Sequence, residues 1–148
     1  MLFGLFIYSI ILAFLLAKVE IQIEGKDGWA EKLPTWKKKN AFINFFLCGS
    51  PLTGYHAWLF SLIFFSYHLP FLIGFPWSKA LELQIIAVYI FFLIMEDFLW
   101  FILNPFYGLG KFSKDQVSWH KKWLWFIPQN YILGFCIGIL LLLVSFIF

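Results

Sequence analysis

The segment from Leu83 to Asn104 is apolar and long enough to cross a lipid bilayer, yet it carries two adjacent carboxylates, Glu96 and Asp97. On insertion scales, an acidic residue at the centre of a membrane helix costs roughly 2.5 kcal/mol or more. Such residues usually mark a functional site that faces the protein interior or a wet cavity. The segment therefore predicts a membrane helix that carries a functional site.

The composition of the chain supports a membrane protein. Of its 148 residues, 62% are hydrophobic and only 13% are charged, and the mean hydropathy is +0.84. Soluble domains average about 25% charged residues. We expect an integral membrane protein whose partner is the lipid bilayer. No nucleic-acid partner is expected, because the net charge of +3 comes from lysines in short loops.

Four apolar runs are each close to the roughly 20 residues that a helix needs to cross the hydrocarbon core. They cover residues 2–22, 53–75, 81–104 and 129–148. A shorter apolar stretch, 42–47, predicts an interfacial piece or an early turn. The predicted fold class is all-α: a polytopic membrane protein with four transmembrane helices and interfacial segments, forming one transmembrane domain over residues 1–148.

The lysines predict the orientation of these helices. Five lysines lie between the first and second runs and four between the third and fourth, whereas only Lys79 lies between the second and third. The positive-inside rule places both lysine-rich loops in the cytoplasm. We expect a multi-pass protein of the cell membrane with both termini outside. Cys48 would then lie near the cytoplasmic boundary and Cys136 within the fourth span, so no disulfide is expected between them.

This topology predicts that most polar residues of the apolar runs meet at one depth, toward the cytoplasm. Glu20 and Glu24 are one helical turn apart and share a face, whereas His68 falls at the opposite end. The residues expected at the common depth are Glu20, Glu24, His56, Glu96, Asp97, Asn104 and His120.

Structural explanations compete for several of these residues. Glu20 and Glu24 could be solvated interfacial carboxylates, and His120, between Trp119 and two lysines, could contact lipid headgroups. His56 could satisfy a backbone carbonyl. Glu96 and Asp97 are the hardest to explain in this way, because a structural role would not ordinarily need both carboxylates.

Two kinds of enzyme chemistry fit this pattern. In the first, the protein acts on a lipid-like or isoprenoid substrate at a cytoplasm-facing pocket with Glu96, Asp97, His56 and Asn104 as candidate catalytic residues. One of the two acids would be the general acid and the other an ionised stabiliser. In the second, a divalent metal assists. Carboxylate and imidazole ligands suit zinc, iron or manganese, and the candidates are Glu20, Glu24, His56, Glu96 and His120.

A different class of function also fits. Four spans without a soluble domain suit a small proton- or cation-coupled transporter, or an accessory subunit of a larger membrane complex, and either could form homo-oligomers. The outer half of the chain has few polar residues beyond Ser66, Tyr67 and His68, which makes a path through the membrane hard to draw.

The hexapeptide from Glu96 to Phe101, Glu-Asp-Phe-Leu-Trp-Phe, resembles the paired-acid, aromatic-rich helix motif of the small polytopic lycopene cyclases of carotenoid synthesis. The resemblance implies acid catalysis on an isoprenoid, with Glu96 and Asp97 protonating a polyene. It covers six residues of the chain. Where that family usually has a proline shortly before the acids, this sequence has Leu93-Ile94-Met95.

Overall fold

A computed structural model of the chain describes residues 1–47 and 49–148, without the side chains of residues 44–46. The prediction made for Cys48 therefore lies outside the described residues. Cys136 is an exposed free cysteine on the last helix.

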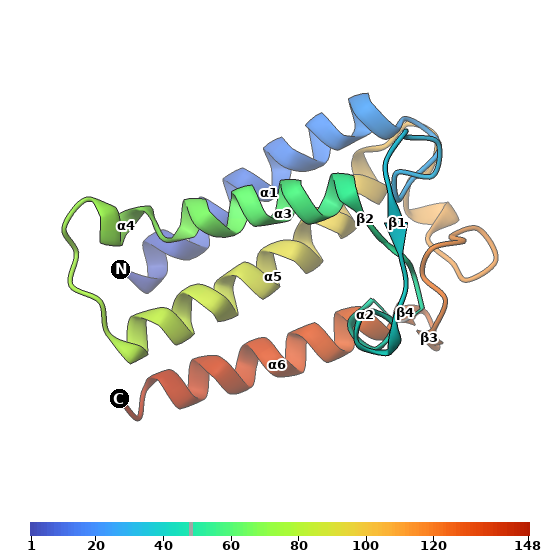
Figure 1. The fold of residues 1–148 in the computed structure, drawn as a ribbon. Helices are drawn as coiled ribbons and strands as arrows, with labels where there is room; N and C mark the ends of the chain where they lie inside the picture. Colours follow the sequence, from blue (N-terminus) through green and yellow to red (C-terminus); the bar gives the residue numbers. More distant parts are fainter. Residues whose placement is uncertain (48) are drawn as a thin grey trace.

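Helices dominate the described residues, which confirms the all-α fold class (Figure 1). The longer helices are α1 (Leu2–Glu24), α3 (Gly54–Tyr67), α5 (Lys79–Leu103) and α6 (Gln129–Ser145). The short ones are α2 (Ala41–Phe46), α4 (Leu69–Leu72) and the 3-10 turn η1 (Leu109–Lys111). Two antiparallel pairs of short strands join β1 (Lys37–Lys38) to β2 (Leu52–Thr53) and β3 (Trp123–Leu124) to β4 (Ile127–Pro128).

The central helix of the bundle is α5, which packs mainly against α1 and α6 and makes fewer contacts with α3 (Figure 1). Its apolar sequence contains no glycine or proline, and the hydroxyl of Ser78 caps its first turn by accepting from the Leu81 N–H at 3.2 Å. Because α5 runs the full length of the bundle, it carries Glu96 and Asp97 toward the end where the long loops lie.

Two glycines let α6 approach α5 closely. A Cβ atom at Gly138 would lie 2.6 Å from the Phe91 ring, and one at Gly134 would lie 3.0 Å from Ile94. These glycines are four residues apart, the spacing that brings small residues onto one face of a helix and lets membrane helices pack tightly.

The predicted span 53–75 is not one continuous helix. Helix α3 ends at Tyr67 and α4 begins at Leu69, with His68 capping both. Pro70 explains the break, since its ring lacks an N–H and clashes with the preceding turn of a continuing helix.

Two helices in the described part of the chain, α1 and α5, are long and apolar enough to cross a membrane. Helix α6 is also apolar but has only 17 residues. These two helices are consistent with membrane association, and the prediction of four spans stays a prediction.

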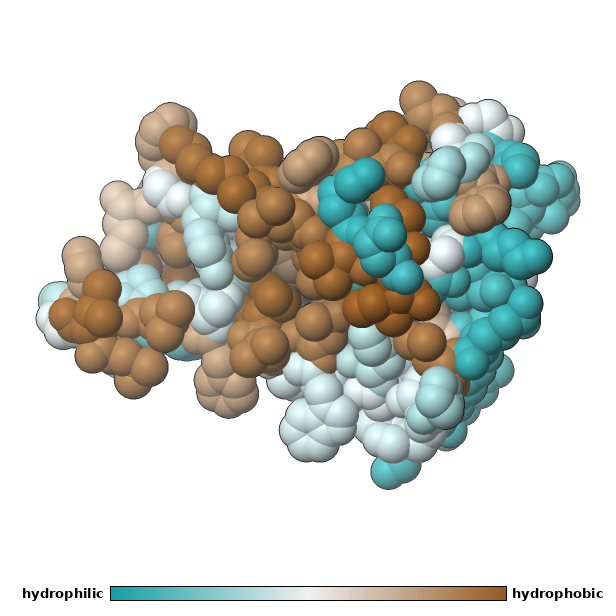
Figure 2. All heavy atoms as spheres, turned by 90° about the horizontal axis from the view of Figure 1, so that it is seen from above, coloured by the Kyte–Doolittle hydropathy of each residue, from teal (hydrophilic) through white to brown (hydrophobic). Residues whose placement is uncertain are grey.

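The two ends of the bundle differ in character. Both termini and α4 lie at one end, and the two lysine-rich loops lie with the four short strands at the other (Figure 1). Hydrophilic residues gather at the loop end, whereas hydrophobic side chains cover much of the helical body (Figure 2). We refer below to the terminal end and the loop end of the bundle.

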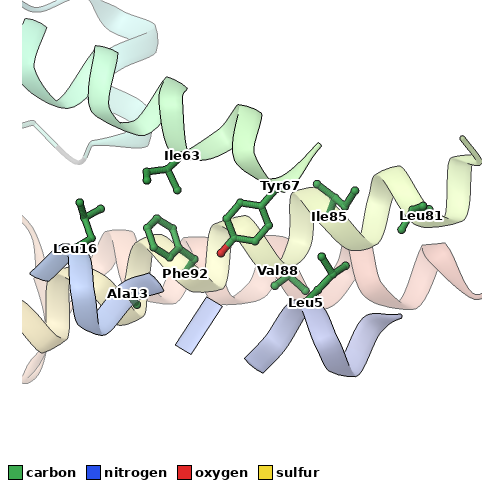
Figure 3. Close-up of a cluster of buried hydrophobic side chains, with 9 residues drawn as sticks. All are labelled: Leu5, Ala13, Leu16, Ile63, Tyr67, Leu81, Ile85, Val88 and Phe92. Atoms are coloured by element: carbon green, nitrogen blue, oxygen red, sulfur yellow. The ribbon is translucent and has the colours of Figure 1, made fainter. Parts of the chain in front are cut away.

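The core near the terminal end consists of apolar side chains from α1, α3 and α5 (Figure 3). Its buried members are Leu5, Ala13, Leu16, Ile63, Tyr67, Leu81, Ile85, Val88 and Phe92. Interhelical hydrogen bonds reinforce this packing: Ser9 Oγ lies 2.6 Å from the Tyr67 hydroxyl, and the Tyr89 hydroxyl donates to the Phe60 carbonyl at 2.9 Å.

Candidate functional site

A cavity of about 330 Å³ lies toward the loop end, between the end of α1, the start of α3, the middle of α5 and the first turns of α6. One part of its wall is polar or aromatic and the other is aliphatic. The polar and aromatic lining residues are Glu20, Glu24, Trp29, His56, Phe60, Glu96, Asp97, Trp100, Trp119, Asn130 and Tyr131; the rest are Leu47, Ile90, Leu93, Ile94, Leu133, Gly134 and Ile137.

Glu20 of α1 and Glu96 of α5 face each other across the helix interface. Both side chains are almost fully buried, with exposed fractions of 3% and 2%. The two carboxyl groups lie close enough to influence each other electrostatically, and the Tyr55 hydroxyl lies beside Glu20. Two carboxylates held near each other in an apolar interface repel, and a proton between them would relieve that repulsion.

Glu24 lies one turn beyond Glu20 and is held by the loop that follows α1. Its Oε1 accepts a hydrogen bond of 2.6 Å from the Ala30 N–H. Trp29 and Ala30 both adopt left-handed backbone conformations, with φ of 59° and 51°. Non-glycine residues rarely adopt this conformation, and it occurs often at functional sites. Here it turns the backbone so that the N–H meets the carboxylate.

His56 connects the first turn of α3 to Glu24. Thr53 Oγ1 accepts from the His56 backbone N–H at 3.2 Å and lies 2.7 Å from its ring Nδ1. A hydroxyl that accepts from the backbone can donate to Nδ1, which places the ring proton on Nε2. Nε2 lies 3.5 Å from Glu24 Oε1, and the imidazole stacks on Trp29 with ring centroids 4.3 Å apart.

Asp97 belongs to a different set of contacts from its neighbour Glu96. His120 Nε2 donates to Asp97 Oδ2 at 3.0 Å, and the Tyr131 hydroxyl donates to the same oxygen. Two hydrogen bonds to one carboxylate oxygen fix the orientation of this side chain. His120 is buried behind Asp97 and does not line the cavity. Adjacent residues on α5 thus carry an acid paired with another acid and an acid paired with donors.

Asn104, a predicted catalytic residue, does not line the cavity. Its Nδ2 donates to the Gly25 carbonyl at 2.7 Å and its Oδ1 accepts from the Phe106 N–H at 3.0 Å. These bonds tie the end of α5 to the end of α1. Nearby, the Tyr107 hydroxyl donates to the Lys26 carbonyl at 2.9 Å, and burial raises the pKa of this phenol.

His68 lies at the terminal end, as the sequence predicted. Its Nε2 is 3.1 Å from Glu82 Oε1, and Trp77 Nε1 donates to the other oxygen of that carboxylate at 3.1 Å. This group ties α3 to α5 far from the cavity.

Five buried side-chain atoms in the described part of the chain have no hydrogen-bond partner, and they cluster. Four belong to residues that line the cavity: Glu20 Oε1, Glu96 Oε1, Trp100 Nε1 and Asn130 Oδ1. The fifth is the Tyr55 hydroxyl, next to Glu20. Native proteins leave few buried polar atoms unpaired, and a cluster of them indicates a place where water, an ion or a ligand binds.

The predicted metal ligands are only partly brought together. Glu20, Glu24, His56 and Glu96 line one cavity, while His120 lies behind Asp97. Within residues 1–47 and 49–148, no group of three or more His, Cys, Asp or Glu side chains is arranged to hold a metal ion. Metal binding remains a prediction without support from this geometry.

Several lining residues were not among the predicted site residues. Trp29 lies in the loop after α1, where no helical period indicates which way a side chain points, and Asn130 is the second residue of α6. Tyr131 lies in the first turn of α6, and only the one-depth argument could have connected it with Asp97.

No protein-family model, curated protein or solved structure matches this chain.

Proposed function

We propose that this protein is a membrane-embedded enzyme that performs acid–base chemistry on a lipid-like substrate bound in the cavity. The observation that carries the proposal is the set of unpartnered polar atoms on four lining residues, beside an aliphatic wall. A binding site for an amphiphile needs these two parts: polar groups that fix the head and apolar groups that accept the chain.

The exposed surface supports a membrane location. Large apolar side chains of α1 point outward, among them Phe3, Ile7, Ile10, Ile11, Phe14, Leu15 and Val19. Water would disfavour such a surface and lipid would not. We propose that α1, α3–α4, α5 and α6 form four spans, with the loop end in the cytoplasm and both termini outside.

The contacts suggest a role for each acid. The Glu20–Glu96 pair is the proton donor and acceptor, because a shared proton can leave one carboxyl and return to it. Asp97, oriented by hydrogen bonds from Tyr131 and His120, stabilises positive charge that develops on the substrate. The resemblance of Glu96–Phe101 to the lycopene cyclase motif agrees with such chemistry, and an isoprenoid is one substrate class that would fit.

A carrier is less well supported than an enzyme. Buried side chains of α1, α3 and α5, most of them apolar, pack against one another toward the terminal end (Figure 3). A transported ion crossing this core would meet few polar groups beyond the hydroxyls of Ser9, Tyr67 and Tyr89.

The proposal predicts that Glu96→Gln abolishes conversion of the substrate. Purified protein is incubated with a total lipid extract from cells that make it, and lipid species are followed over time by mass spectrometry. Wild type should convert at least one species. Glu96→Gln should slow that conversion by roughly 10²-fold or more, the usual contribution of a general acid or base.

Glu82→Gln is the matched control, since it changes a carboxylate at the terminal end. It should convert lipid at the wild-type rate. A wild-type protein that converts no lipid, or a Glu96→Gln variant that works at full rate, would contradict the proposal.

A further inference from the structure

The polar part of the cavity is acidic and aromatic. The carboxyl groups of Glu20, Glu24, Glu96 and Asp97 all line it, and no lysine is among the described lining residues. The lysines lie in the segments at the loop end of the bundle, in α1 and at the start of α5. A phosphate or carboxylate placed in this cavity would meet four acids at close range, where like charges repel strongly. The lining therefore selects against anionic heads.

Three tryptophans add to this preference. Trp29, Trp100 and Trp119 line the cavity, and Trp100 packs edge-on against Trp119 with centroids 5.6 Å apart. Tryptophan faces attract cations, and an ammonium group enclosed by aromatic rings and carboxylates is well stabilised. The buried atoms without hydrogen-bond partners also favour a cationic ligand, because more of them are acceptors than donors.

Among the lining residues, the acceptors without partners are Glu20 Oε1, Glu96 Oε1 and Asn130 Oδ1, and the one donor is Trp100 Nε1. The Tyr55 hydroxyl beside Glu20, outside the lining, can donate or accept. An ammonium group carries three N–H donors and no acceptor, so it can satisfy the three oxygens. A carboxylate head offers no donor, and an alcohol offers only one.

The aliphatic wall fixes where the chain of such a molecule goes. Ile90 and Ile94 of α5 form one part of it, and Leu133 and Ile137 of α6 form another. Phe60 of α3 lines the same cavity. A single alkyl chain can lie along this wall with its head at Glu96.

We infer that the cavity binds a single-chain lipid amine, with its ammonium group among Glu20, Glu96 and Asn130 and its chain between α5 and α6. The inference rests on the proposed function and names its substrate class. In that role the carboxyl pair takes a proton from the ammonium, which leaves a neutral, nucleophilic amine.

The test compares three probes with the same twelve-carbon chain: dodecylammonium, dodecanol and dodecanoate. Binding to the full-length protein in neutral lipid nanodiscs is measured at pH 7 by equilibrium dialysis. Wild type should bind dodecylammonium at least tenfold more tightly than dodecanol, and dodecanoate least of all. Non-specific attraction to the protein's charge of +3 would favour dodecanoate instead, so it cannot mimic this order.

Glu96→Gln distinguishes the contribution of charge to binding from that of shape, because it removes the carboxylate and keeps the size of the side chain. This substitution should lower the affinity for dodecylammonium about tenfold, since hydrogen bonds to charged groups are the stronger ones. It should change the affinity for dodecanol less than threefold. Glu82→Gln should change neither. Equal wild-type affinity for the amine and the alcohol, tighter binding of dodecanoate, or an equal loss for both probes in Glu96→Gln would each overturn the inference.

The order of the three probe affinities in the wild-type protein tests the inference even where a variant fails to fold. This measurement is also independent of turnover. Amine-selective binding without any lipid conversion would leave this inference standing and contradict the enzyme proposal. Conversion of a lipid without an amine would do the reverse.

Discussion

At the scale of single residues, Glu96 and Asp97 are neighbours in sequence with different surroundings. Glu96 meets another carboxyl, Glu20, whereas Asp97 receives hydrogen bonds from His120 and Tyr131. The period of a helix separates adjacent side chains by about 100°. One acid therefore faces α1 and the other faces α6 and the loop before it.

The contact between Glu20 and Glu96 predicts a conflict between stability and activity. In Glu20→Gln, the new amide can donate a hydrogen bond to Glu96 Oε1, which has no partner, and the repulsion between two carboxyl groups is lost. We expect the free energy of unfolding to rise by about 1 kcal/mol, the value of one hydrogen bond, while lipid conversion falls. Unfolding by SDS titration at pH 7 measures the first effect.

Glu82→Gln should lower the free energy of unfolding in the same titration, because the Glu82 carboxylate already has two partners, His68 and Trp77. A loss of stability in Glu20→Gln as large as that in Glu82→Gln would show that the Glu20 carboxylate is satisfied as it stands.

At the scale of elements, the apolar sequence predicted α1 and α5 well, because both are long apolar runs without proline and the one glycine among them, Gly4, lies in the first turn of α1. The helical period also predicted that Glu20 and Glu24 share one face of α1, and the structure shows both side chains to be buried. The period could not show that His68 and Pro70 would divide the second run. Nor could it show that Asn104 would bind the backbone of the loop after α1 rather than enter the cavity.

The glycine face of α6 gives a prediction at this scale. A methyl group at Gly138 would press on the Phe91 ring, so the two helices must move apart. We expect Gly138→Ala to lower the free energy of unfolding by roughly 1–3 kcal/mol, as overpacking does. Gly4→Ala is the control, since a methyl group there meets nothing within 4 Å. Equal effects of both changes on SDS unfolding would contradict the close approach of α6 to α5.

At the scale of the whole molecule, alternation of helix direction predicted the meeting of Glu20, Glu24, His56, Glu96 and Asp97 at one cavity. That argument needed only the order of the apolar runs and the depth of each residue within its run. It could not supply Trp29, because the path of a loop depends on local turns such as the left-handed one at Trp29 and Ala30.

The proposed orientation makes a prediction for the intact cell. Single cysteines are introduced by Pro76→Cys, at the terminal end, and by Lys38→Cys and Lys114→Cys, at the loop end; all three positions are exposed. A membrane-impermeant maleimide should label Pro76→Cys on intact cells and the other two only after permeabilisation, with wild type as the blank. Labelling of Pro76→Cys and Lys38→Cys from the same side would contradict a span made by α3 and α4.

The unequal lengths of the helices have a consequence for the surrounding lipid. At 1.5 Å per residue, the 25 residues of α5 extend about 37 Å, but the 17 of α6 extend only about 25 Å. A bilayer about 30 Å thick must thin beside α6. Lipid headgroups would then sit deeper along α6, one of the helices that border the cavity, than along α1. A lipid that enters the cavity from there would begin closer to the depth of Glu96 than a lipid beside α1.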